Sequence, residues 1–116
     1  MSFLSRLLGG DPSASLDPAA FVAERDPEAP LLDVRTPSEF ASGHLAGAVN
    51  VDVQAADFVD RAEALGLPEA GPVYVYCRSG NRSARATDLL RGLGYGGAVN
   101  VGGFDALVRS GAEAAR

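Results

Sequence analysis

The chain contains a single cysteine, Cys77, in a segment whose residue types favour a reactive thiol. The segment reads Cys77-Arg78-Ser79-Gly80-Asn81-Arg82-Ser83 and follows an apolar, β-branched and aromatic run at residues 73–76, which predicts a buried strand. Residues 84–91 are good helix formers with an apolar face. A thiol between a strand and a helix faces backbone N–H groups and the positive end of the helix dipole. We therefore expect Cys77 to ionise more easily than an ordinary cysteine.

The alternative is a core cysteine, which is the usual role of a lone cysteine at the end of an apolar strand. The residues that follow Cys77 argue against it. Arg78 and Arg82 are unusual in a turn that only closes over a buried thiol, and Gly80 permits a backbone in which N–H groups converge on one point. We interpret Cys77 as the catalytic residue and residues 78–83 as the loop that binds substrate.

Composition narrows the chemistry further. An apolar fraction of 47% and a net charge of −5 fit a folded globular protein and disfavour nucleic acid as a partner. Between Cys77 and Arg91, however, four arginines accompany one acid, Asp88. A basic segment in an acidic chain predicts a small anionic ligand, or an acidic group on a partner.

The residues that several catalytic mechanisms require are missing from the chain. All ten basic residues are arginine, which excludes lysine Schiff bases. One cysteine and one histidine exclude an internal disulfide and make a zinc site untenable, so we expect neither a metal nor a cofactor. Because the chain has no second thiol, a covalent intermediate on Cys77 must be discharged by another molecule.

The chain is expected to form one domain over residues 13–116, preceded by a short helix or flexible arm at residues 1–12. Phe3, Leu4, Leu7 and Leu8 lie at helical spacing in that arm. It is too short for a signal peptide, and no apolar run is long enough to span a membrane. We expect a cytoplasmic protein with no membrane partner.

The elements that must position the loop alternate between strands and helices. Strands are predicted at residues 31–34, 47–51, 73–76 and 98–101, and helices after Asp17, from Thr36 to about Gly43, and at residues 55–65, 84–91 and 104–108. Asp17-Pro18 predicts a helix start, and Thr36-Pro37-Ser38-Glu39 a capping box. Short, continuously apolar strands predict an α/β fold whose mostly parallel sheet of about four to five strands is covered by helices on both faces.

Polar residues cluster near the predicted strand ends. Asp33, Asn50, Cys77 and Asn100 lie at or near the carboxyl ends of four strands, where ligands bind in open α/β sheets. The pentapeptide Gly-Ala-Val-Asn-Val occurs at residues 47–51 and 97–101. We do not interpret it as a structural repeat, because the flanking sequences differ.

Four segments resemble, in order, the landmarks of the rhodanese-like sulfurtransferases, and together they cover residues 31–107. The landmarks are the loop at residues 77–83, Leu32-Asp33-Val34-Arg35-Thr36-Pro37-Ser38-Glu39-Phe40, Gly43-His44-Leu45-Ala46-Gly47-Ala48-Val49-Asn50, and Gly94-Tyr95 with Val101-Gly102-Gly103-Phe104. The resemblance implies a thiosulfate sulfurtransferase-type enzyme, in which the Cys77 thiolate takes sulfur from a small anionic donor such as thiosulfate. The resulting persulfide passes sulfur to cyanide, an external thiol or a sulfur-acceptor protein.

The resemblance also implies roles for other residues. Backbone N–H groups of residues 78–83 are expected to surround the sulfur. Arg78 contacts the anionic donor, or is a solvated surface residue. Arg82 contacts the donor, or pairs with an acid such as Asp33. Ser83 forms a hydrogen bond to the sulfur or caps the helix. Asp33 and Arg35 support the loop from the neighbouring strand, and His44 belongs to a structural turn.

The loop length selects among related functions. Cys77 to Arg82 is Cys-x4-Arg, whereas related phosphatases and arsenate reductases have a loop one residue longer that holds a tetrahedral oxyanion. The shorter loop favours a sulfur atom on the cysteine. Two alternatives remain: a persulfide carrier that relays sulfur between proteins, and a non-catalytic regulatory binding module, whose members usually lack the cysteine.

Overall fold

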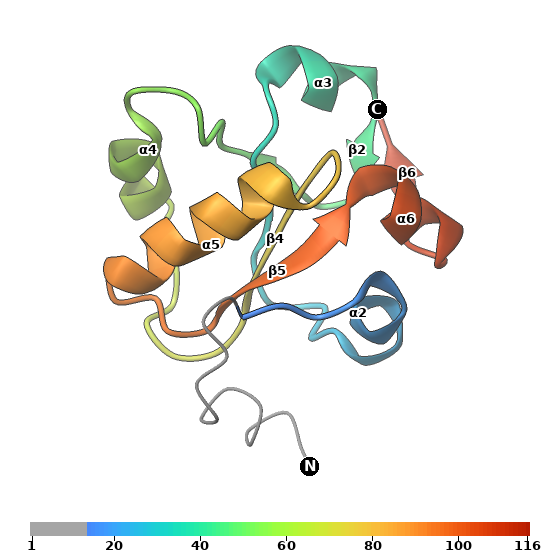
Figure 1. Cartoon of the computed structure of the whole chain (residues 1–116), viewed down its shortest axis with the longest axis horizontal. Coiled ribbons are helices and arrows are strands. Elements are labelled where there is room, and N and C mark those ends of the chain that lie inside the picture. Colours follow the sequence, from blue (N-terminus) through green and yellow to red (C-terminus); the bar gives the residue numbers. More distant parts are fainter. Residues whose placement is uncertain (1–13) are drawn as a thin grey trace.

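The computed structural model describes residues 14–116, which form a parallel sheet between helices (Figure 1). The sheet contains four strands in the order β3-β1-β4-β5, all parallel. Its strands are β1 (Leu31–Asp33), β3 (Val49–Asn50), β4 (Val73–Cys77) and β5 (Ala98–Gly103). The helices are α2 (Pro18–Glu24), α3 (Pro37–Ser42), α4 (Phe58–Ala64), α5 (Asn81–Gly92) and α6 (Phe104–Arg109). The predicted α/β fold with a parallel central sheet is confirmed.

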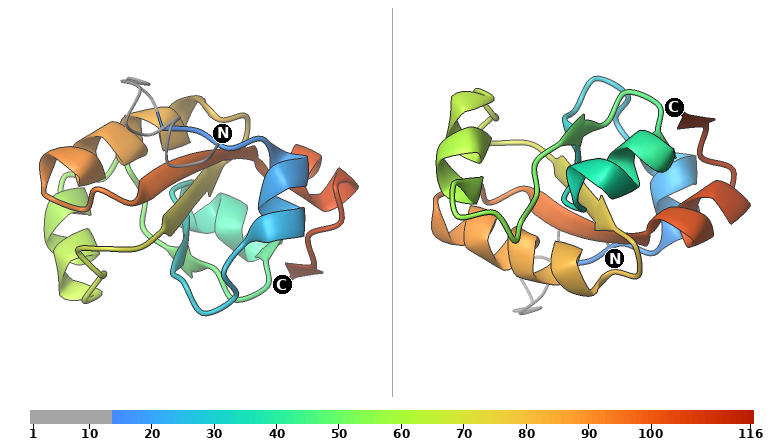
Figure 2. Two further views of the ribbon diagram at one scale, coloured as in Figure 1. Left: turned by 90° about the horizontal axis from the view of Figure 1, so that it is seen from below. Right: turned by 90° about the horizontal axis from the view of Figure 1, so that it is seen from above.

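Side chains of β4 alternate between two apolar cores, one on each face of the sheet. Val73, Val75 and Cys77 enter the core that α4 and α5 cover, whereas Tyr74 and Tyr76 enter the core on the side of α2 and α6. Figure 2 shows these helix pairs on opposite sides of the sheet. Successive strand residues point to opposite faces, so this alternation places the thiol on the face of α5.

Two predicted helix starts are confirmed in detail. The Asp17 carboxylate accepts a hydrogen bond from the Ala20 N–H at 2.8 Å, at the start of α2. At the start of α3, the Glu39 N–H donates to the Thr36 hydroxyl at 3.2 Å, and the Thr36 N–H donates to the Glu39 carboxylate at 3.0 Å. This reciprocal pair is the expected capping box.

Some element bounds differ from prediction. Helix α4 begins at Phe58 rather than near Ala55, because Asp52 starts a turn in which its carboxylate accepts from the Gln54 N–H at 2.8 Å. The strand expected at residues 47–51 is reduced to Val49–Asn50, and the one expected at 98–101 extends to Gly103.

The sequence did not predict an antiparallel pair between β2 (His44–Leu45) and β6 (Ala114–Ala115). Strands of two residues are too short to show a period. The expected arm at residues 1–12 lies outside the described residues. Among the described residues, no helix has the length and apolar character needed to cross a membrane.

The two copies of Gly-Ala-Val-Asn-Val need their glycines for different reasons. A Cβ at Gly97 would overlap the Gly71 carbonyl group, whereas Gly47 has open space but a φ of 83°. We expect Gly97→Ala to lower the free energy of unfolding by about 2 kcal/mol or more, since the backbones must separate. The adjacent Gly96→Ala has open space and no positive φ, so it is the matched control. Equal urea midpoints for both variants would contradict the close approach.

Candidate active site

Cys77 is the last residue of β4, and hydrogen-bond donors converge on its sulfur. The Gly80 N–H donates to Sγ at 3.0 Å, and the Ser83 hydroxyl lies 3.3 Å from it. The residue is only 1% exposed, and burial alone would also fit a core cysteine. The donors distinguish the two interpretations, because an apolar core supplies none.

The loop between β4 and α5 depends on glycine at two points. Gly80, the N-cap of α5, has a φ of 101°, a conformation that is costly for residues with a Cβ. Gly103 at the end of β5 lies under the loop, and a Cβ there would overlap the Arg78 carbonyl. The loop can therefore fold back over the thiol while resting on the neighbouring strand.

The hydrogen bonds to the sulfur lower the pKa of the Cys77 thiol by more than burial raises it. Burial raises the pKa of the Cys77 thiol, but bonds from the Ser83 hydroxyl and from the N–H groups of Ser83, Ser79 and Gly80 leave that pKa below its ordinary value. These groups stabilise the thiolate. The expected shift in acidity is thus explained mainly by local donors.

Arg82 pairs with an acid, but the acid is Glu39 rather than Asp33. Its two terminal nitrogens donate to the two Glu39 oxygens at 2.7 and 2.9 Å. The Arg82 guanidinium lowers the pKa of Glu39 to about 2. Since Glu39 also belongs to the capping box, one carboxylate joins the start of α3 to the start of α5. Asp33 has a different partner.

That partner is Arg35, and the pair is buried. The Arg35 guanidinium donates to both carboxylate oxygens of Asp33, at distances from 2.6 to 3.1 Å, and to the Gly43 carbonyl at 2.7 Å. The Tyr76 hydroxyl donates to Asp33 at 2.8 Å and accepts from the Leu45 N–H at 2.9 Å. This network comes next to the loop at Tyr76, the residue before Cys77, and it links β1 and β4 to β2.

Arg78 is exposed beside the loop, and no ion pair of its side chain is found within residues 14–116. It lines a small cavity of about 280 Å³ together with Arg35, Glu39, Ser42, Phe104 and Asp105. The neighbouring loop residues Ser79 and Asn81 are also exposed. Arg78 is therefore the loop arginine available to an anion, whereas Arg82 is engaged.

Two further polar residues have clear places. His44 stacks on the Phe40 ring at a centroid distance of 3.7 Å, and its Nδ1 lies 2.9 Å from the Phe40 carbonyl oxygen, as expected for a structural turn. Ser83 lies inside α5 and does not cap it, since the N-cap is Gly80 and has no side-chain cap. Of the two roles expected for Ser83, the structure shows the contact with the sulfur and not the helix cap.

Sequence reasoning gave Asn100 a position but no role. The structure brings its amide group onto the loop: Nδ2 donates to the Gly80 carbonyl at 3.0 Å, and Oδ1 accepts from the Ser83 hydroxyl at 2.7 Å. Its place near the end of a parallel strand was the only available signal.

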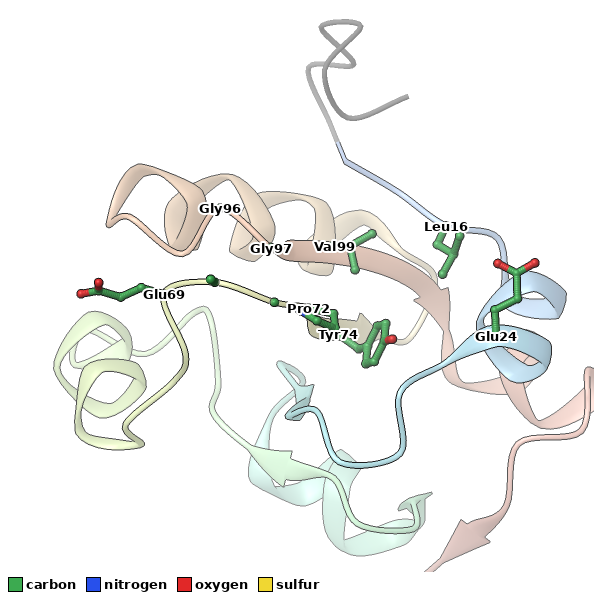
Figure 3. Close-up of a pocket in the computed structure, with 10 residues that line it drawn as sticks. Leu16, Glu24, Glu69, Pro72, Tyr74, Gly96, Gly97 and Val99 are labelled. Atoms are coloured by element: carbon green, nitrogen blue, oxygen red, sulfur yellow. The ribbon is translucent and has the colours of Figure 1, made fainter. Parts of the chain in front are cut away.

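A larger cavity of about 530 Å³ lies elsewhere, between the amino-terminal parts of β4 and β5 and helix α2 (Figure 3). Tyr74, Val99 and Pro72 line it, with Glu24 and Glu69 as its charged residues. Because both charged residues of this cavity are acidic, it suits the anionic ligand expected from the sequence less well than the arginine-bearing loop after Cys77.

Comparisons with known proteins identify the family to which the chain is similar. A family model described as "Rhodanese-like domain" matches residues 18–110. The chain is 36% identical over 90 residues to thiosulfate sulfurtransferase 16, chloroplastic, of Arabidopsis thaliana, covering 69% of this chain and 74% of that protein. It is 33% identical over 92 residues to the thiosulfate sulfurtransferase GlpE of Pseudomonas entomophila, covering 78% and 80%. The solved rhodanese-like domain of an Anabaena sp. protein superimposes with a TM-score of 0.73 at 27% identity, covering 87% and 77%.

The Glu39–Arg82 pair predicts a pH-dependent contribution to stability. The pKa of Glu39 is lowered from 4.5 to about 2 in the folded chain, so its ionised form favours folding. The contribution is complete above the unfolded-state pKa and disappears as the pH falls through about 2. We expect Glu39→Gln to lower the free energy of unfolding by about 1 kcal/mol at neutral pH, a value reduced for solvent screening.

Urea unfolding between pH 2 and 7 measures this effect, with Glu63→Gln, which replaces an exposed glutamate of α4, as the matched control. The difference between wild type and Glu39→Gln should narrow steadily below pH 4.5. A difference that is constant across this range would show that the ion pair is not its cause.

Proposed function

The chain belongs to the rhodanese-like domain family, and we propose that it is a sulfurtransferase that carries sulfane sulfur on Cys77. It takes sulfur from an anionic donor such as thiosulfate and gives it to a nucleophilic acceptor. The observation that carries this proposal is the convergence of Gly80 and Ser83 on the Cys77 sulfur. Relatives named thiosulfate sulfurtransferases support the same reaction class.

The proposed reaction has two displacement steps. The Cys77 thiolate attacks the outer sulfur of thiosulfate, a new S–S bond forms, and the donor's S–S bond breaks with its electron pair leaving on sulfite. An acceptor such as cyanide or a thiolate then attacks the outer sulfur of the persulfide. Thiocyanate or a new persulfide departs, and the Cys77 thiolate is regenerated. No net oxidant is needed, and the mechanism is a ping-pong covalent transfer.

The loop donors suit both ends of this cycle. Donors that lower the thiol pKa make the attacking thiolate available. The same groups can stabilise the thiolate when it leaves the persulfide in the second step. Arg78 is exposed at the mouth of the loop, and its charge suits the sulfonate part of thiosulfate.

The position of Arg82 supports sulfur transfer over phosphate chemistry. Related phosphatases use a loop one residue longer, whose wider cradle holds a tetrahedral oxyanion. Here the loop is Cys-x4-Arg, and both terminal nitrogens of Arg82 face Glu39. A tetrahedral oxyanion would lose that arginine as a donor.

A persulfide carrier in a protein-to-protein relay is the second candidate. It is favoured by the lone cysteine, since sulfur bound to Cys77 must leave to another molecule. A non-catalytic binding module is disfavoured because the cysteine and its donors are all present.

We expect wild-type protein incubated with thiosulfate to gain the mass of one sulfur atom, and Cys77→Ser to gain none. Intact mass spectrometry measures this gain, and subsequent cyanide should remove the sulfur and release thiocyanate. Absence of a mass gain would overturn the thiosulfate assignment. A stable adduct that cyanide does not discharge but a protein thiol does would favour the carrier.

Arg78→Ala is expected to raise KM for thiosulfate about tenfold, because a hydrogen bond to a charged group is removed. The midpoint of thiol alkylation against pH should not change. Arg85→Ala is the control, because Arg85 is also an exposed arginine but lies in α5 and not in the loop. This variant should keep the wild-type KM. Equal effects from both variants would indicate general electrostatic attraction rather than a donor contact.

A further inference from the structure

The repeated pentapeptide places one asparagine in each edge strand of the four-stranded sheet. Asn50 lies in β3, which pairs with β1, and Asn100 lies in β5, which pairs with β4. Both are half-buried. Each therefore stands beside a strand that ends in a loop leading to a helix: β1 leads to α3, and β4 leads to α5.

Each asparagine donates hydrogen bonds to the loop that follows its neighbouring strand. Asn50 Nδ2 donates to the Asp33 and Arg35 carbonyls at 3.0 and 2.9 Å, at the end of β1. Asn100 Nδ2 donates to the Gly80 carbonyl at 3.0 Å. In both cases an asparagine amide on an edge strand donates to backbone carbonyls of a neighbouring loop. Only the loop that Asn100 binds follows the thiol.

Asn100 forms hydrogen bonds to both residues that donate to the Cys77 sulfur, Gly80 through its backbone and Ser83 through its side chain. Gly80, whose carbonyl it binds, supplies the N–H that lies 3.0 Å from Cys77 Sγ. Ser83, whose hydroxyl lies 2.7 Å from Asn100 Oδ1, supplies the hydroxyl that lies 3.3 Å from Sγ. The Gly102 N–H donates to the same Oδ1 at 3.0 Å, which fixes the amide orientation.

The Ser83 hydroxyl has one proton for two acceptors. Its distance to Asn100 Oδ1 is typical of an O–H···O bond, so the proton is directed to Asn100 when the sulfur is uncharged. Asn100 keeps the hydroxyl on the side of the sulfur, from which it can turn to a thiolate.

We propose that Asn100 is a positioning residue for Cys77, because it binds the Gly80 carbonyl and orients the Ser83 hydroxyl. Asn50 makes comparable bonds to the loop after β1, which carries no thiol. For turnover this inference rests on the proposed sulfurtransferase function, whereas for thiol reactivity it does not. Arg82 is bound to Glu39 and not to Asn100, so we expect that ion pair to persist when Asn100 is replaced.

The test compares Asn100→Ala with Asn50→Ala. The rate of iodoacetamide alkylation of Cys77 is measured against pH, and urea unfolding is measured for both variants. We expect the alkylation midpoint of Asn100→Ala to rise by about one pH unit, which lowers the rate well below the midpoint about tenfold. Asn50→Ala should lower stability while the midpoint stays at the wild-type value.

An unchanged midpoint in Asn100→Ala, or an equal rise in Asn50→Ala, would overturn the proposal. Should Asn100→Ala fail to fold, Asn100→Ser with Asn50→Ser as control applies the same criterion, because the shorter hydroxyl does not span to the Gly80 carbonyl. Sulfur uptake from thiosulfate is a separate measurement. Its absence in wild type, with the midpoint still shifted in Asn100→Ala, would reject the proposed function and leave the positioning role standing.

Discussion

The site depends on the hydrogen bonds that the β4–α5 loop donates to the Cys77 sulfur. The neighbouring strands and helix hold the loop where it can make them. A buried thiol in apolar surroundings has a raised pKa, and Cys77 belongs to the core between the sheet and α5. Gly80 and Ser83 reverse that tendency by donating to the sulfur. The loop must therefore be held closely over the strand end, and three neighbouring elements contribute to this.

Each of these elements holds the loop by a different physical means. Strand β5 lets the backbone approach at Gly103 and supplies the Asn100 amide. Helix α3 supplies Glu39, which pairs with Arg82 in the first turn of α5. Strand β1 contributes less directly, since Asp33 binds the Tyr76 hydroxyl one residue before the thiol. The position of the loop is thus held by contacts between its own residues and the neighbouring strands and helix.

The buried pair of Asp33 and Arg35 illustrates how charge is accommodated near the site. Both residues are almost fully buried, and burial of a charge is tolerated only with a partner and further hydrogen bonds. Their remaining bonds go to Tyr76 and to the Gly43 carbonyl. The pair therefore connects the sheet to the β2–β6 strand pair, while Arg82 and Glu39 serve the loop.

The sequence by itself determined the parallel α/β fold, the capping box and the strand–loop–helix setting of Cys77, because these depend on local composition and on residues a few positions apart. Tertiary structure alone decided which acid Arg82 pairs with and what Asn100 does. Glu39 and Arg82 are 43 residues apart, and Gly80 and Asn100 are 20 apart. Such pairings are fixed by which strands become neighbours and in what register. The register shift between β4 and β5 after Val75 has no local signal.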